Sequence, residues 1–133
     1  MVRDEEESMP KSGVLTSPNY PDRYPHNQHS TQIIQVAEGN TIRFAWTDFD
    51  TEYPYDYVQI QDENGTDLMP YAKISGTSKS LPPPVWGSML GQYVSSSNII
   101  QVKFSTNYNH AYTGWRLEWY EIINDGKNHN LYC

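Results

Sequence analysis

The most regular feature of the sequence is an alternation of apolar and polar side chains at every second position. Because successive side chains of an extended strand point to opposite faces, this period places one face in a core and the other in solvent. Residues 42–46, 58–60, 100–104 and 115–119 show it clearly, and residues 32–36 show it less regularly. No 3.6-residue period persists for two turns. The pattern predicts half-buried β-strands and no α-helix longer than about two turns.

Turn-forming residues separate the predicted strands. The sequence Glu-Gly-Asn at 38–40 links two of them. Asn64-Gly65 predicts a tight hairpin of the type I′ class, in which both central residues have positive φ. Three consecutive prolines at 82–84 exclude a central strand and predict an extended loop. Short strands separated by turns, without helices, favour an all-β fold, an antiparallel two-sheet β-sandwich.

The two ends of the sequence differ from the part between them. Residues 1–11 are polar and acidic, and residues 123–133 are rich in Asn, Asp, Gly, Lys and His. We expect both to be frayed tails on one sandwich domain at residues 12–122. A chain of 133 residues with 37% hydrophobic residues has enough apolar surface for one core, and burial in a domain of this size does not require disulfides.

Charge and cysteine content limit the classes of function that fit the sequence. The net charge is −7 and the nine basic residues are scattered, which argues against nucleic-acid binding and against binding to anionic membranes. No apolar run approaches the roughly 20 residues of a membrane helix, so we expect no membrane insertion. The single cysteine, Cys133, excludes an internal disulfide and leaves a disulfide between chains open. Cysteine usage by itself gives no support for a secreted protein.

Several motifs, taken in order, resemble the CUB domain family. Residues 13–25 match the family pattern G-x-[IL]-x-S-P-x-Y-P-x-x-Y-P, and residues 49–60 resemble its central acidic loop and the next strand. Residues 95–104 with Gly114-Trp115 resemble its C-terminal hairpin. Each motif alone is weak, but their order over residues 12–120 is hard to obtain by chance. The resemblance implies a sandwich of jelly-roll type and a non-catalytic module of extracellular or membrane-anchored multidomain proteins.

The sequence departs from this family at its cysteines. Most members carry two disulfides, and all four expected cysteines are missing. Ser75, before Gly76, stands where one cysteine is usual, and the segment that usually holds another is shortened to Tyr53-Pro54. We expect the fold to form without its usual cross-links.

Carboxylates gather where the predicted core ends. If the parity of the 42–46 strand continues, Asp48, Asp50 and Glu52 lie on its core side, and Asp56 lies on the core side of the next strand. Carboxylates that converge in partial burial take up protons or bind a cation. Ca²⁺ is the natural cation because it prefers several hard oxygen ligands in flexible geometry.

An EF-hand loop is excluded as the form of this site. In a loop that begins at Asp48, Tyr53 stands where glycine is needed and Gln59 stands where glutamate is needed.

The family resemblance implies a different calcium site. It implies one Ca²⁺ held by Glu52 and Asp56, with Asn107 at a position where many members have aspartate, and with Tyr24 orienting the glutamate through its hydroxyl. Asn107 offers an amide oxygen without charge, so we expect weakened affinity. Backbone carbonyls near Tyr108 would complete the shell. The alternative is an acidic surface loop without a metal, in which Asp56 caps turn amides.

Two classes of function fit these observations. The first is an extracellular module for calcium-supported protein–protein interaction, whose acidic loops accept a Lys or Arg side chain of a protein partner. Its rim contacts would be Tyr53, Tyr55, Tyr108 and His110. The second is a carbohydrate-binding or adhesive module that stacks exposed Tyr rings on a glycan. In either case we expect a secreted or extracellular chain that is part of a larger protein.

Other candidate chemistry is weaker. His26 and His29 lack a third zinc ligand at fitting spacing and are expected to be loop residues. The sequence contains no Gly-x-Ser-x-Gly elbow and no glycine-rich phosphate loop, so we expect no enzyme. The sequon Asn64-Gly65-Thr66 fits N-glycosylation of a secreted chain, or serves only the turn.

Overall fold

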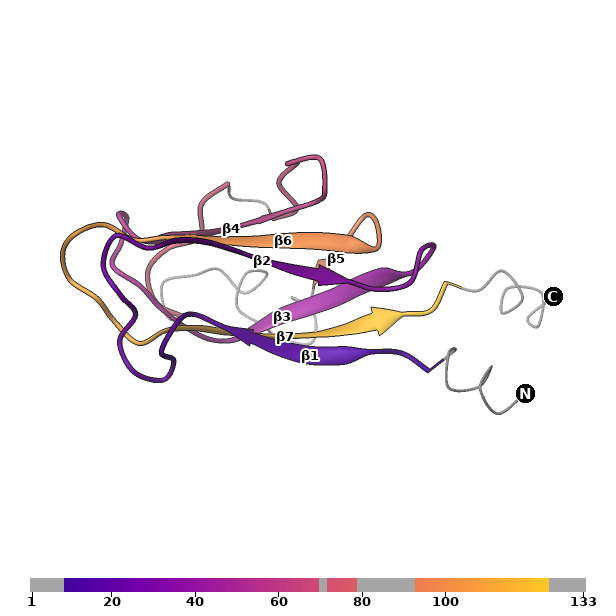
Figure 1. Cartoon of the computed structure of the whole chain (residues 1–133), viewed down its shortest axis with the longest axis horizontal. Helices are drawn as coiled ribbons and strands as arrows, with labels where there is room; N and C mark the ends of the chain where they lie inside the picture. The colour runs from indigo at the N-terminus through magenta and orange to yellow at the C-terminus, as the bar shows by residue number, and fades with distance from the viewer. Residues whose placement is uncertain (1–8, 70–71, 79–92, 125–133) are drawn as a thin grey trace.

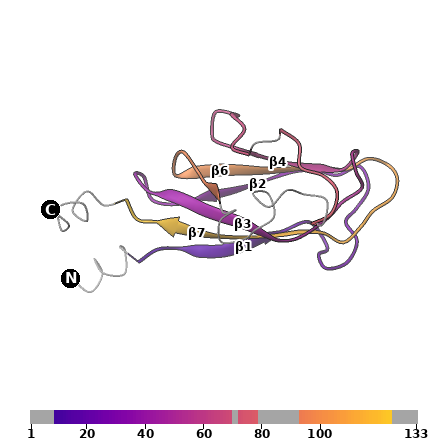
Figure 2. The same cartoon turned by 180° about the vertical axis from the view of Figure 1, so that it is seen from behind.

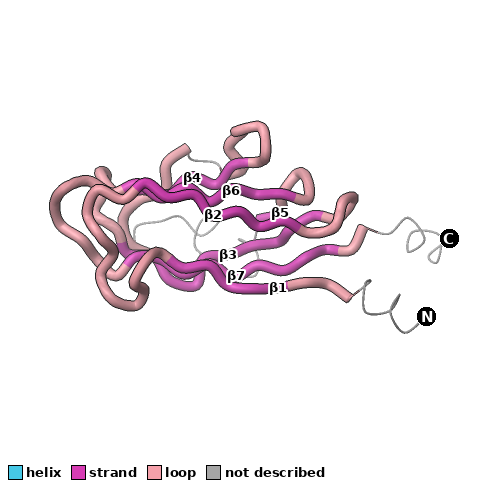
Figure 3. Tube along the Cα trace, in the orientation of Figure 1, coloured by secondary structure: helices cyan, strands magenta, loops and turns pink. Residues whose placement is uncertain are grey.

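The structure, a computed structural model, describes residues 9–69, 72–78 and 93–124. In this part of the chain it has strands and no helix (Figure 3). The strands are β1 (Ser12–Thr16), β2 (His29–Gln35), β3 (Thr41–Asp50), β4 (Tyr57–Gln61), β5 (Tyr93–Val94), β6 (Ile99–Ser105) and β7 (Gly114–Ile122). They form two antiparallel sheets, in the orders β1-β7-β3-β5 and β2-β6-β4, stacked as two layers (Figure 1). The predicted antiparallel two-sheet β-sandwich is confirmed.

Two strands form without the alternation that predicted the other five. β1 pairs along its whole length with β7, from Ser12 opposite Tyr120 to Thr16 opposite Arg116. β5 has only two residues and pairs with β3, Val94 lying opposite Arg43. Both are edge strands whose extended form depends on pairing with a longer neighbour, a signal that a local pattern does not contain.

The core between the sheets is rich in aromatic rings. The predicted inward positions of β3 are buried: Ile42, Phe44 and Trp46 are at most 1% exposed. The Trp46 ring meets the rings of Phe49 and Trp115 edge-on, with centroids 4.9 and 5.7 Å apart. Such edge-to-face contacts add about 0.5–1.5 kcal/mol each beyond the area that they bury.

Strand β3 changes parity in its middle. Its register against β7 shifts between Trp46 and Asp48, which marks a β-bulge around Thr47. After the bulge the buried positions are Phe49 and Thr51, at 1% and 2% exposure. The expectation that Asp48 and Asp50 lie on the core side is therefore wrong, because one extra residue turns the remainder of the strand over.

The turn after β4 also differs from its prediction. Gly65 has a φ of +84°, whereas Asn64 is absent from the described non-glycine residues with positive φ, so the turn is not type I′. Asp62 and Thr66 close a three-residue loop through the bond from Asp62 N–H to Thr66 O, 2.9 Å. A three-residue hairpin loop with a left-handed last residue is the next most common kind after two-residue loops.

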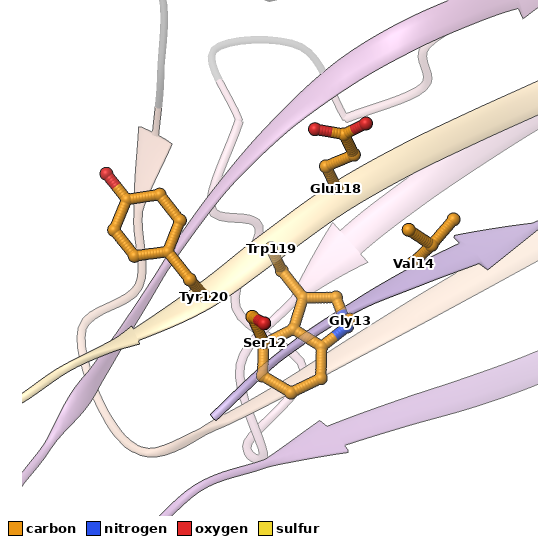
Figure 4. Close-up of a pocket in the computed structure, with 6 residues that line it drawn as sticks. All are labelled: Ser12, Gly13, Val14, Glu118, Trp119 and Tyr120. Atoms are coloured by element: carbon orange, nitrogen blue, oxygen red, sulfur yellow. The ribbon is translucent and has the colours of Figure 1, made fainter. Parts of the chain in front are cut away.

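Glycine at position 13 permits a close approach between β1 and β7. Trp119 is partly buried and its indole lies over Gly13 (Figure 4), where a Cβ atom would come within 2.9 Å of the ring. A shallow surface depression surrounds this contact, and its lining residues are Ser12, Gly13, Val14, Glu118, Trp119 and Tyr120.

Glu121 joins three segments at the end of the sandwich where β1 begins. It is 5% exposed, and its carboxylate accepts bonds from Lys11 N–H at 2.9 Å, Ala37 N–H at 3.1 Å and Asn40 Nδ2 at 2.7 Å. The Asn40 N–H donates to Ala37 O, which confirms the turn predicted at 38–40. The proline loop at 82–84, Cys133 and most of the two expected tails lie outside the described residues. No described segment is a helix able to cross a bilayer.

Candidate functional site

Three loops meet at the end of the sandwich opposite Glu121. They are residues 17–28, 51–56 and 106–113, which Figures 1 and 2 show together beyond the ends of the strands. Main-chain bonds join the first loop to the third, with Asn27 N–H donating to Asn107 O at 2.8 Å and Tyr24 N–H donating to Tyr112 O at 3.1 Å. The residues of the predicted calcium site and of its predicted rim all lie in these three loops.

Asp56 is the buried centre of this end. It precedes β4 on the core side, as its parity predicted, and is 1% exposed. Its Oδ2 accepts the Tyr24 hydroxyl at 2.6 Å and its Oδ1 accepts the Asn107 N–H at 2.8 Å. Burial raises the pKa of Asp56, while these two bonds oppose the rise and the nearby Glu52 charge adds to it. Each carboxylate oxygen keeps lone-pair capacity beyond the bond that it accepts.

Tyr24 holds Asp56 rather than the carboxylate of Glu52. Its ring is 2% exposed, and its hydroxyl donates to Asp56 and accepts the main-chain N–H of Glu52 at 3.2 Å. Burial raises the pKa of the Tyr24 hydroxyl, so it stays protonated and can donate. The expected Tyr24 contact with the Glu52 side chain is corrected: Tyr24 fixes the backbone of Glu52 and the side chain of Asp56.

Glu52 has one engaged and one free carboxylate oxygen. Its Oε2 lies 3.0 Å from His110 Nδ1. Its Oε1 is buried and has no hydrogen-bond partner among the described residues. A buried carboxylate oxygen without a donor is unfavourable unless a cation or water satisfies it.

Asn107 is the third predicted calcium ligand, and the structure places it next to Asp56. Its N–H reaches Asp56, and its side-chain Oδ1 accepts the N–H of Asn109 at 3.1 Å. Glu52, Asp56 and Asn107 thus belong to one bonded network with Tyr24 and His110, and the three loops that supply these five residues are far apart in sequence.

Ser75 fixes the backbone of the acidic loop, a role that the sequence did not predict. Its hydroxyl lies 2.6 Å from Asp56 O and 3.4 Å from Glu52 O. The Thr51 hydroxyl adds a bond of 3.1 Å to Asp56 O and accepts the Gly76 N–H at 3.0 Å. Side-chain hydrogen bonds therefore connect the loop to residues 75–76, at the position where the family resemblance implies a cysteine.

Asp48 and Asp50 do not join this group. Asp48 Oδ2 accepts the Tyr20 hydroxyl at 2.6 Å, and Asp50 Oδ2 accepts Thr113 Oγ1 at 3.4 Å. Burial raises the pKa of Asp50, and the bond from Thr113 partly offsets the rise. The predicted convergence of four carboxylates is reduced to the pair Glu52 and Asp56, because the bulge in β3 turns the other two outward.

The predicted rim residues remain open to solvent. Tyr53, Tyr55 and Tyr108 are 73%, 61% and 76% exposed. The side chain of His110 is 60% exposed even though it pairs with Glu52. Two aromatic side chains from the acidic loop and one from the 106–113 loop therefore present contact area beside the buried carboxylates.

The oxygen atoms gathered by these loops are of the kind that Ca²⁺ prefers. No group of three or more His, Cys, Asp or Glu side chains in the described part of the chain is placed to hold a metal ion. Neither His26 nor His29 belongs to such a group. The Nδ1 of His29 lies 3.3 Å from Ser105 Oγ. Two carboxylates and an amide nevertheless supply hard oxygens, and the free Oε1 of Glu52 is an atom that a cation would satisfy.

Comparison with known proteins agrees with the sequence motifs. The CUB domain model matches residues 5–119. Cubilin of Sus scrofa is 30% identical over 112 residues, which cover 80% of this chain and 3% of cubilin. Mannan-binding lectin serine protease 1 of Rattus norvegicus is 29% identical over 121 residues, 82% of this chain and 14% of that protein. The chain thus spans a small part of the relatives that it matches.

Solved structures give the same result. The CUB1-EGF-CUB2 domains of human MASP-1/3 superpose with a TM-score of 0.70 at 22% identity, covering 89% of this chain and 44% of that one. The crystal structure of the MASP-1 CUB2 domain bound to Ca²⁺ matches with a TM-score of 0.61 at 26% identity, covering 81% and 90% of the two chains. CUB domains are binding modules that are not themselves catalytic, which supports the expectation of no enzyme for this domain. The chain belongs to the CUB domain family.

Proposed function

We propose that this domain is an extracellular protein-binding module whose loops 52–56 and 107–110 hold one Ca²⁺ and accept a basic side chain of a partner. The observation that carries the proposal is the buried, unpartnered Oε1 of Glu52 beside the buried carboxylate of Asp56. Glu52, Asp56 and Asn107 would hold the ion, and Tyr24 would orient Asp56. Bound Ca²⁺ would supply positive charge beside the buried carboxylate of Asp56, whose pKa burial raises.

The protein's own residues prepare this site. Tyr24 and the Asn107 N–H hold both oxygens of Asp56, and Ser75 with Thr51 fixes the main chain that carries it. Little rearrangement is then needed on binding. With two charged ligands the affinity falls in the range of extracellular calcium modules, a Kd of about 10⁻⁴ to 10⁻³ M.

Such an affinity is useful only where calcium is millimolar. The relatives cubilin, tolloid-like protein 1 and mannan-binding lectin serine protease 1 are secreted or extracellular proteins that contain CUB domains within larger chains. The MASP-1 CUB2 domain was solved bound to Ca²⁺. Both facts support an extracellular place in a larger protein.

The partner's chemistry follows from charge and shape. The chain has a net charge of −7, and the rim offers exposed Tyr rings next to carboxylate oxygens. A Lys or Arg side chain can pair with the outer oxygens while its aliphatic stem lies on the aromatic faces.

Calcium titration tests the metal site. We expect a calorimetric signal in the stated range and, at ten times Kd, a stabilisation of about 1.4 kcal/mol relative to chelator. Glu52→Gln should abolish the signal, whereas Glu38→Gln, an exposed carboxylate in the turn at the opposite end, should leave it unchanged. Asn107→Asp should tighten binding because it adds a charge. No signal from the wild-type chain up to about 10 mM Ca²⁺ would refute the site.

The partner surface needs its own measurement. N-acetyl-lysine methylamide, titrated in the presence of Ca²⁺, should shift NMR signals of Tyr53, Tyr55 and Tyr108, and Glu52→Gln should remove the shifts. Equal shifts in chelator would contradict the role of calcium in partner binding.

The exposed rings also favour a second candidate, glycan binding. Tyr53, Tyr55 and Tyr108 are each more than half exposed on neighbouring loops, where a sugar ring can stack on them. A glycan array probed with and without chelator distinguishes the two, since binding that persists in chelator and is lost in Tyr108→Ala points to stacking.

A further inference from the structure

The turn at residues 62–66 projects from the edge of the β2-β6-β4 sheet, after β4 (Figure 1). Asn64, Gly65 and Thr66 are all exposed. An added Cβ atom at Gly65 would meet nothing within 4 Å, so the space above the turn is open. These three residues form the only Asn-x-Ser/Thr sequence of the chain whose middle residue is not proline.

The conformation of the turn does not require asparagine at position 64. The bonds that organise it come from Asp62, whose Oδ1 accepts Asn64 N–H at 2.8 Å and Thr66 N–H at 2.9 Å. The left-handed residue is Gly65, while Asn64 is not among the described residues with positive φ. Tolerance of positive φ, one of the two reasons for which turns favour asparagine, therefore does not apply at position 64.

The side chain of Asn64 is also unused. Its main-chain N–H is bonded, but no hydrogen bond of its carboxamide is found within the described structure. The turn is anchored instead by neighbours, with Ser97 Oγ donating to Glu63 Oε1 at 2.7 Å and Gln101 Nε2 donating to Asp62 O at 2.8 Å. The result is a fixed turn that presents a free, solvated carboxamide two residues before a threonine hydroxyl.

We propose that Asn64 is an N-glycosylation site. In the transfer, Asn64 Nδ2 forms a bond to the anomeric carbon of a lipid-linked oligosaccharide. The bond from that carbon to the lipid pyrophosphate breaks, the pyrophosphate leaves with the electron pair, and the proton that the amide loses balances one negative charge on the released pyrophosphate. The inference rests on the extracellular placement proposed above, since only a chain that enters the secretory pathway meets this donor.

The position of the glycan is compatible with the binding function. β4 starts at Tyr57, next to Asp56, and ends at Gln61, so the turn lies at the opposite end of that strand from the candidate calcium site. A glycan on Asn64 extends away from the loops at 51–56 and 106–113. It would occupy solvent beside the edge of the sheet while the partner surface stays open.

The experiment supplies a signal sequence, so that modification is tested separately from native secretion. The full chain is translated with a cleavable signal in the presence of microsomal membranes, and the protease-protected fraction is examined by electrophoresis and peptide mass. We expect a shift of one oligosaccharide that peptide N-glycosidase removes, leaving aspartate at position 64. Asn64→Gln and Thr66→Ala should each abolish the shift, and Glu63→Gln, adjacent but outside the sequon, should retain it.

Two results would overturn the proposal. One is a protected wild-type chain whose peptide carries unmodified Asn64. The other is a shift that survives in Asn64→Gln. Calcium binding is measured on the folded domain without a glycan, so an unmodified Asn64 would not contradict the proposed calcium site. Likewise, an absent calcium signal would not decide whether Asn64 is modified, because the electrophoretic shift measures that separately.

Discussion

The hydroxyl of Tyr24 contacts both ends of the 51–56 loop, through the main chain of Glu52 and the side chain of Asp56. Tyr24→Phe removes the donor to Asp56 Oδ2 at 2.6 Å and the acceptor of Glu52 N–H at 3.2 Å. The ring stays in place, with its edge-on contact to Phe104 at 5.1 Å, so the substitution leaves no cavity. The measured loss therefore reports hydrogen bonding and not packing.

The expected loss is about 2–4 kcal/mol in the free energy of unfolding at neutral pH. A hydrogen bond to a charged group contributes about 1.5–3 kcal/mol, and an N–H left without an acceptor adds a smaller amount when it is partly buried. The loss should shrink as pH falls through the pKa of Asp56, because a protonated carboxyl group no longer needs the donor. Removal of that donor should also raise the pKa of Asp56 further, since the Tyr24 bond is one of the contacts that lower it.

Urea unfolding in chelator, followed by tryptophan fluorescence, measures the effect. Tyr53→Phe is the matched control: the same atom is removed from a ring that is 73% exposed, and the expected change is within about 0.5 kcal/mol. Combination with Asp56→Asn should give a coupling energy above about 1 kcal/mol. If Tyr24→Phe costs less than about 1 kcal/mol, or costs the same beside Asp56→Asn, the hydroxyl does not hold the carboxylate as described.

Two further predictions concern the stability of the fold. The pKa of Glu121 is below its usual range: burial alone would raise it, but bonds from Asn40, Lys11 and Ala37 outweigh burial. Glu121→Gln should therefore lower the free energy of unfolding by about 1–3 kcal/mol at pH 7, measured by urea unfolding. This loss should vanish as pH falls from about 4.3, the value in the unfolded chain, through the lowered pKa of the folded state. A loss that does not change with pH would contradict the argument. Gly114→Ala should melt far below Gly65→Ala, because both have positive φ but only the first places a Cβ against buried Ser17; equal melting temperatures would show that φ alone matters.

The sheets were predictable from the sequence because the alternation of apolar and polar residues is a local feature of each core strand. Ile42, Phe44 and Trp46 alternate in the sequence and are buried as the period requires. The bulge was not predicted, since the alternation argument assumes an unbroken strand. A signal was present in the spacing of Trp46 and Phe49, two large apolar residues three positions apart, which a continuous strand would place on opposite faces.

The site was predictable in part for the same reason. Asp56 followed from the parity of its own strand, whereas the place of Tyr24 rested on the family resemblance. The role of Ser75 depends on how residues 72–78 pack against the 51–56 loop, and the pairing of Asp48 with Tyr20 depends on the outward face that the bulge creates. Such contacts between distant segments are set by sheet register and loop course, which no local pattern contains.

The pairing of β1 with β7 determines how the domain would respond to tension. The outer ends of the two strands lie together, with Ser12 opposite Tyr120, and the chain enters and leaves this ladder at one end of the sandwich (Figure 1). Force applied to the chain before β1 and after β7 would act first on the hydrogen bonds between Lys11 and Glu121. The ladder would then open one residue pair at a time, as in unzipping. In shear, by contrast, all the pairs would resist the force together. The loop that carries Glu52 and Asp56 is at the far end, so it would keep its geometry until β1 had separated from β7.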